Sequence, residues 1–157
     1  MGVFFLSMFF YQQLPVSDTA HIREFYRVFS SGTLEEVNTG IKNLGSARHL
    51  SQFNAYKGAM LMKKAVLEKT PEAKLNTFKT GYRLLETEIS KYPQNAELRF
   101  LRLAIQEHAP EFLKYNKNLQ EDRSIVIEGY RKLDPLIQEF ILQYGIKSKV
   151  LTVNDLH

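Results

Sequence analysis

Apolar residues recur along this chain at steps of three and four, the spacing that places them on one face of an α-helix. The clearest stripe lies within residues 74–89 and contains Leu75, Phe78, Tyr82, Leu85 and Ile89. Between residues 96 and 108 the apolar positions instead cover about two-thirds of a helical wheel, which predicts a helix packed between neighbours on both sides. Strand-like alternation is nearly absent, so the pattern predicts an all-α fold.

Capping residues and prolines divide this pattern into separate helices. Thr33 and Glu36 have the spacing of a capping box, Asn118 can cap the helix that follows it, and Asp134 precedes a proline at the first helical position. Helices are expected at about 18–29, 33–44, 46–69, 75–92, 96–108, 119–132 and 134–145. Their short connections predict stacked antiparallel helical hairpins.

The two ends of the chain differ from this helical middle. Residues 18–145 are expected to form one helical domain and residues 146–157 a loose C-terminal tail. The apolar run within residues 1–17 is too short to span a bilayer, and its length suits a secretory signal that lacks the usual positive flank. The alternatives are a signal, which implies export or a periplasmic location, and a first helix packed on the core of a cytoplasmic protein. Residues 3–11 are the expected means of any membrane association.

Composition excludes several classes of function. The chain has no cysteine, which rules out disulfides, thiolate metal sites and a cysteine nucleophile. The net charge is +4, and residues 42–102 hold twelve Lys or Arg against five Asp or Glu. This basic middle fits an acidic protein partner, whereas nucleic acid is not expected because no recognition motif accompanies the charge.

Residues 93–115 resemble the start of a tetratricopeptide repeat, with Pro93 closing one unit and the small Ala104 among large neighbours. The glycines at 58 and 81 are expected to let two helices approach closely. The fold is therefore expected to be a degenerate tetratricopeptide-like stack. The segments "AYKGAMLMKKA" at 55–65, "KLNTFKTGYRLLETEI" at 74–89, "NAELRFLRLAIQEHAPEFLKYN" at 95–116 and "ED" at 121–122 resemble an uncharacterised family of small bacterial helical proteins. The resemblance implies the fold and an export signal, and it brings no activity.

No catalytic residue, metal site or cofactor is predicted. The four histidines lie far apart in the sequence, and no glycine-rich phosphate loop or nucleophile motif is present. The nearest approach to an acid–base cluster is His108 with Glu107 and Glu111. At the end of a helix, His108 is expected to interact with the last carbonyl groups.

Three functions remain from the sequence. The first is a non-catalytic protein-interaction module of unknown oligomeric state, whose partner-binding residues would be Arg99, Arg102, Gln106, Lys63, Lys64, Lys79 and Arg83. The alternative for the two arginines is internal pairing with acids such as Glu86 or Glu121. The second function is a small-ligand carrier or an accessory of a membrane-associated system, which an apolar pocket under residues 56–62 would favour. The third is an enzyme, which a pocket joining His108 to a carboxylate of another helix would favour.

Overall fold

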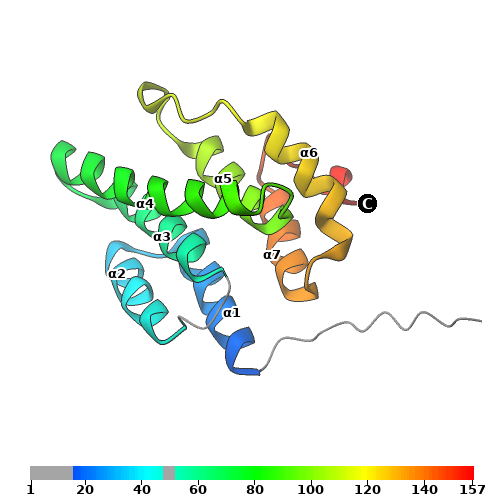
Figure 1. Ribbon diagram of the computed structural model, residues 1–157, viewed down its shortest axis with the longest axis horizontal. Helices are drawn as coiled ribbons and strands as arrows, with labels where there is room; N and C mark the ends of the chain where they lie inside the picture. Colours follow the sequence, from blue (N-terminus) through cyan, green and yellow to red (C-terminus); the bar gives the residue numbers. More distant parts are fainter. Residues whose placement is uncertain (1–15, 48–51) are drawn as a thin grey trace, which may run out of the picture.

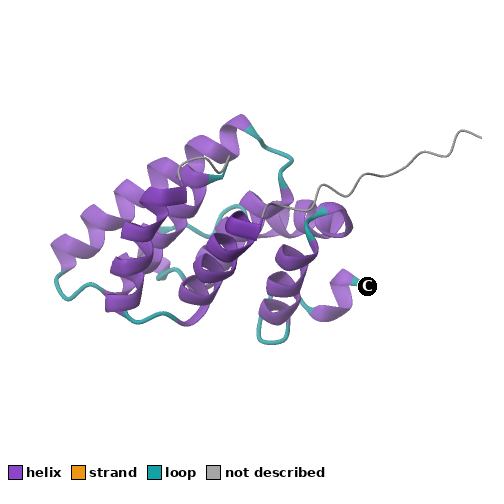
Figure 2. Ribbon diagram, turned by 90° about the horizontal axis from the view of Figure 1, so that it is seen from below, coloured by secondary structure: helices purple, strands orange, loops and turns teal. Residues whose placement is uncertain are grey.

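The computed structural model describes residues 16–47 and 52–157. Within these residues the chain forms seven α-helices and no β-strand, which confirms the predicted all-α fold (Figures 1 and 2). The helices are α1 (Val16–Ser31), α2 (Leu34–Asn43), α3 (Phe53–Leu67), α4 (Pro71–Lys91), α5 (Ala96–His108), α6 (Leu119–Gly129) and α7 (Pro135–Gly145). Short 3₁₀ turns lie at Leu44–Ala47, Glu111–Leu113, Tyr130–Lys132 and Val153–Leu156.

The N-terminal boundary lies earlier than the sequence predicted, because α1 begins at Val16. Residues 1–15, which make up most of the predicted signal segment, lie outside the described residues. Residues 48–51, which belong to the predicted third helix at 46–69, also lie outside the described residues. The predicted start at 46 falls within a 3₁₀ turn at Leu44–Ala47, and α3 begins at Phe53.

Helix starts follow the predicted capping residues. The Oγ1 of Thr33 accepts a hydrogen bond from the amide of Glu36, whose carboxylate accepts from the amide of Thr33, so the capping box before α2 is confirmed. Asp134 likewise caps α7 by accepting from the amide of Leu136 at 2.9 Å. Asn118 does precede α6, but its side chain makes no capping hydrogen bond.

Helices α3 and α4 form an antiparallel hairpin in which the two backbones touch (Figure 1). A Cβ atom placed on Gly58 would lie 2.8 Å from both the carbonyl oxygen of Gly81 and the amide nitrogen of Leu85. A Cβ on Gly81 would lie 2.6 Å from the carbonyl oxygen of Gly58. The predicted close approach of these two helices at their glycines is confirmed.

Helix α5 lies between neighbours on both sides, as its apolar wheel predicted. Every residue from Ala96 to Ala104 is buried. One face packs antiparallel to α6, since Gly129 lies against Ala96 and the amide of Asn118 donates to the side chain of Gln106 at 3.0 Å. The other face packs toward α1 and α7, which meet through stacked aromatic rings at Tyr26 and Phe140. Each fully buried leucine of α5 contributes about 1.5–3 kcal/mol to the stability of this arrangement.

The C-terminal segment corrects the sequence-based boundary at residue 145. Leu151 and Leu156 are buried in the same apolar core as the helices. Arg123 of α6 donates to the carbonyl oxygen of Val150 and pairs with Asp155. The prediction of a loose tail at 146–157 is therefore wrong, because this segment closes one end of the core.

The described residues contain two antiparallel hairpins, α3–α4 and α5–α6, that pack through α3 and α5. A tetratricopeptide-like superhelical stacking of such hairpins stays a prediction.

Candidate functional site

Arg99, Arg102 and Gln106 share one face of α5, as predicted, but that face is buried against α6. The fully buried carboxylate of Asp122 lies at its centre. Its Oδ1 accepts hydrogen bonds from Arg99 at 2.9 Å and from Arg102 at 2.7 Å. Its Oδ2 accepts from Arg102 at 2.8 Å and from Gln106 at 2.6 Å. One aspartate thus fixes three side chains of the neighbouring helix.

The same two arginines reach the outer acids that the sequence named as internal partners. Arg102 pairs with Glu86 of α4 at 2.8 Å, and Arg99 pairs with Glu121 at 3.3 Å. The internal-pairing alternative is confirmed, and the partner-binding prediction for Arg99, Arg102 and Gln106 is wrong. The physical reason is that the arginines are buried in ion pairs with internal acids. Breaking such a buried pair destabilises a protein by about 3–5 kcal/mol.

The remaining predicted partner-binding residues do not form one surface with this buried face. Lys64 lies 3.5 Å from the carboxylate of Glu68 on its own helix. Lys79 and Arg83 are exposed on α4. Lys63 is half-buried on α3 and lines a cavity.

His108 and its acidic neighbours have separate roles. The Nδ1 of His108 lies 3.0 Å from the carbonyl oxygen of Ala104, which confirms the expected contact with a carbonyl near the helix end. Glu111 belongs to the exposed turn after α5. The histidine is therefore held by the backbone of its own helix.

Glu107 fastens the segment after α7 to α5. Its carboxylate accepts hydrogen bonds from the hydroxyl groups of Tyr144 and Ser148 and from the amide of Lys149. Burial acts to raise the pKa of Glu107, but the hydrogen bonds from Ser148, Tyr144 and Lys149 outweigh it and hold that pKa below its usual value. The carboxylate is thus ionised and fully engaged.

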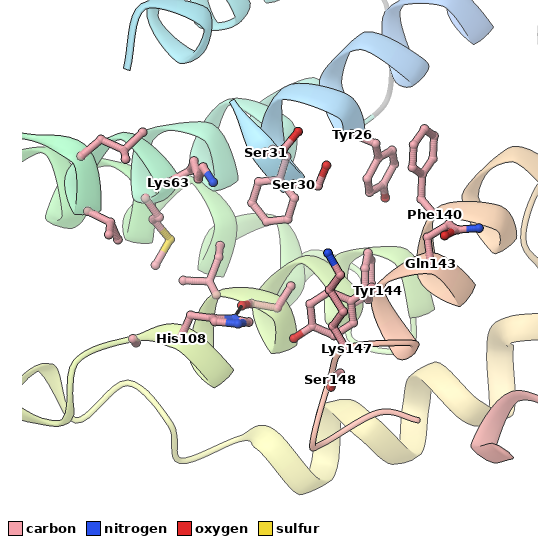
Figure 3. Close-up of a pocket in the computed structure, with 18 of the residues that line it drawn as sticks. Tyr26, Ser30, Ser31, Lys63, His108, Phe140, Gln143, Tyr144, Lys147 and Ser148 are labelled. Atoms are coloured by element: carbon pink, nitrogen blue, oxygen red, sulfur yellow. Dashed lines mark hydrogen bonds between the residues drawn. The ribbon is translucent and has the colours of Figure 1, made fainter. Parts of the chain in front are cut away.

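A cavity of about 670 Å³ opens between α1, α3, α5 and α7 (Figure 3). This volume lies within the range of small-molecule pockets, about 300–1,000 Å³. Five segments of the chain form its walls: the last turns of α1, the second half of α3, Phe78 of α4, one face of α5 with the loop after it, and the end of α7 with the turn that follows it.

Most of the cavity wall is carbon. The apolar lining residues are Phe29, Met62, Val66, Leu67, Phe78, Phe100, Ala104, Ile105, Ala109, Pro110, Leu113, Phe140 and Ile146, together with the ring of Tyr26. Val66 and Ile146 are 58% and 63% exposed, so the apolar lining continues outward to the mouth. Apolar side chains left open to water in this way mark a surface that gains free energy when a ligand covers it.

The polar groups of the cavity gather on its rim. Figure 3 shows Lys63 reaching in from α3 and Lys147 from the turn after α7, with Ser30, Ser31 and His108 around the same space. Burial lowers the pKa of Lys63 from its usual value. None of the described carboxylates forms an ion pair with Lys63 or Lys147. The rim therefore presents unpaired positive charge.

Sequence reasoning identified Lys63 and His108 of this rim but missed Lys147 and Ser148, because it assigned them to a loose tail. Ser30 and Ser31 were interpreted only as the end of the first helix. One available signal was the apolar Ile146 just beyond the helix-ending glycine at 145. No local pattern could show that these separate segments enclose one space.

Among the described residues, no three His, Asp or Glu side chains lie close enough together to hold a metal ion. None of the described helices combines the length and the apolar character needed to cross a membrane.

Comparison of the chain with protein-family models, with curated proteins and with solved structures finds no match. The resemblance to a family of small bacterial helical proteins stays a prediction from the sequence.

Proposed function

We propose that the protein is a non-catalytic carrier that binds a small apolar molecule in the cavity between α1, α3, α5 and α7. The observation that carries this proposal is the 670 Å³ space with a carbon-lined wall and an open mouth. An apolar pocket near residues 56–62 was the condition that would favour a carrier. Met62 is the residue of that stretch that lines the cavity, and Lys63, Val66 and Leu67 beyond it complete the α3 side of the wall.

The free energy of binding would come from the burial of apolar surface, both of the ligand and of the cavity wall, away from water. Burial contributes about 25 cal/mol for each Å² of apolar surface. The wall is already formed by packed helices, so little ordering cost opposes binding. A preformed apolar pocket with a few polar groups at its edge is typical of small-molecule sites.

The composition of the wall supports a binding role over a catalytic one. An enzyme would be favoured by a carboxylate from another helix close to His108. The lining contains His108 but no Asp or Glu among the described residues. Without such a partner the site offers no paired acid and base for proton transfer.

A protein-binding role rests on fewer residues than the sequence predicted. Burial removes Arg99, Arg102 and Gln106 from any surface, which leaves Lys79 and Arg83 exposed on α4. An acidic partner for these two side chains stays a prediction.

The carrier proposal is tested with Nile red, a neutral dye whose fluorescence rises in apolar surroundings. Ala104 is buried on the α5 wall, so Ala104→Phe places an aromatic ring where a ligand would lie. We expect this variant to bind the dye at least tenfold more weakly, which corresponds to about 1.4 kcal/mol. Titration of the dye at fixed protein concentration measures the change.

The matched control is Ala20→Phe, which adds the same ring at an exposed position of α1 outside the cavity. Circular dichroism establishes that both variants keep the helical fold. If wild-type protein fails to bind the dye, or if both variants bind it as the wild type does, the carrier proposal is wrong.

A further inference from the structure

We propose that the ligand of this cavity is an amphiphile with one acidic head group, held between Lys63 and Lys147, and a single apolar chain. This inference rests on the proposed carrier function and adds the chemical class of the ligand. It follows from the charge of the rim, the state of the nearby acids and the apolar wall behind them.

The rim has positive charge and no negative charge of its own. The residues that line the cavity include two lysines and one histidine but no Asp or Glu. Figure 3 shows Lys63 and Lys147 entering from different sides, α3 and the turn after α7. Both ammonium groups would attract an anion that enters the cavity, and each can donate charge-assisted hydrogen bonds to it.

Glu68, the acid closest in sequence to Lys63, and Glu107, which contacts the segment next to Lys147, are engaged elsewhere. Glu68 lies next to Lys64, and Glu107 accepts three hydrogen bonds from the segment after α7. Neither carboxylate belongs to the cavity wall. Lys63 is thus half-buried without a counter-ion, and the burial that lowers its pKa would be offset by a bound anion.

The neutral groups of the rim also favour an acceptor-rich head. The hydroxyl groups of Ser30 and Ser31 donate to the carbonyl oxygen of Arg27, and that of Ser148 donates to Glu107. The side-chain amide of Gln143 and the two lysine ammonium groups are donors on the lining that can face the ligand. Beyond the rim the wall is carbon, so a second charged group further along the ligand would lose its hydration without gaining a partner. One acidic end and one apolar chain fit both parts of the site.

The test compares decanoate, decanol and decylamine, which share one chain and differ in the charge of the head. Each competes with Nile red for the wild-type protein at neutral pH and low salt. We expect decanoate to displace the dye at a concentration about tenfold lower than decanol, and decylamine to be the weakest competitor. Added salt is expected to reduce the advantage of decanoate over decanol.

Replacement of a rim lysine should weaken the binding of decanoate but not that of decanol. We expect Lys63→Gln and Lys147→Gln each to reduce the advantage of decanoate over decanol about five- to tenfold, with displacement by decanol unchanged. Lys79→Gln, an exposed lysine of α4 outside the cavity, is the control and should change nothing. Lys147 is exposed, so its variant tests the inference even if Lys63→Gln loses structure.

Two outcomes contradict the inference in distinguishable ways. If the dye binds but all three competitors displace it equally, or decylamine displaces it best, the acidic head is wrong and the carrier function stands. If neither the dye nor any competitor binds, the carrier function fails and the ligand class fails with it.

Discussion

Glu97 is a carboxylic acid in the middle of the core, where it joins three helices without a cation. Its Oε1 accepts hydrogen bonds from Tyr26 of α1 at 2.9 Å and from Tyr56 of α3 at 2.5 Å. Burial raises the pKa of Glu97, and the two hydroxyl groups only partly counteract it. In the folded protein this group therefore keeps its proton to a higher pH than it does in the unfolded chain.

This shift makes the stability contribution of Glu97 depend on pH. In the unfolded chain the group titrates near 4.5, and above that pH the unfolded state binds fewer protons than the folded state. Stability is lost as pH rises from 4.5 through the raised folded pKa. Glu97→Gln removes this titration. We expect the melting temperature of the variant, relative to that of the wild type, to increase as the pH is raised above about 4.5.

Thermal melts followed by circular dichroism at each pH give the melting temperatures of the wild type and of Glu97→Gln. The other titrating groups are common to both proteins, so their effects cancel in the difference. Glu128→Gln, on the exposed side of α6, is the control for replacing a carboxylate by an amide. A constant or falling difference for Glu97→Gln would show that Glu97 is ionised in the folded protein.

The polar core also shows what residue types can predict by themselves. The sequence named Glu86 and Glu121 as internal partners of the two α5 arginines, and both pairs form. It did not identify Asp122, the acid at the centre. Glu121 and Asp122 are adjacent acids, and the sequence does not indicate which of them faces the neighbouring helix. Burial decides between them: Asp122 is fully buried, and the Glu121 side chain is 55% exposed.

At the scale of elements, apolar periodicity identified the helices and which face of each is apolar. It could not show how far a neighbouring helix extends along that face. In the stripe of α4, Leu85 and Ile89 are buried, whereas Leu75 and Tyr82 are 44% and 42% exposed. The glycines were more informative, because an interior glycine that costs about 1 kcal/mol indicates a close helix contact.

The α3–α4 contact predicts that a single methyl group added at Gly58 destabilises the protein. In Gly58→Ala the new Cβ would meet two backbone atoms at 2.8 Å, which no side-chain rotation can relieve. We expect the free energy of unfolding to fall by about 1–3 kcal/mol, although alanine favours helix by about 1 kcal/mol. Urea denaturation measures the change.

Gly45→Ala is the matched control for this substitution. No atom lies within 4 Å of a Cβ at Gly45, and none of the described glycines has a positive φ angle. The control should leave stability unchanged or slightly higher. A Gly58→Ala variant as stable as the wild type would show that the two helices can separate at no cost.

At the scale of the whole molecule, the last residues of the chain close both the core and the cavity. Leu151 is fully buried, and the nearby Lys147 and Ser148 line the cavity rim. The segment lacks helical periodicity, which is why the sequence predicted a loose tail. The spacing of Thr152 and Asp155 was an available signal, since these residues form a capping box in the structure.

Leu151→Ala tests whether this segment belongs to the cooperative unit. Removing a buried leucine side chain leaves a cavity, so the free energy of unfolding should fall by about 2–5 kcal/mol. Asn154→Ala, at an exposed position of the same segment, should change it by less than about 0.5 kcal/mol. Urea denaturation followed by circular dichroism measures both variants.

Because α7 and the rim lysine at 147 are held by this segment, Leu151→Ala should also weaken Nile red binding, whereas Asn154→Ala should not. Equal stability of the two variants would mean that residues 146–157 fold independently of the helical core.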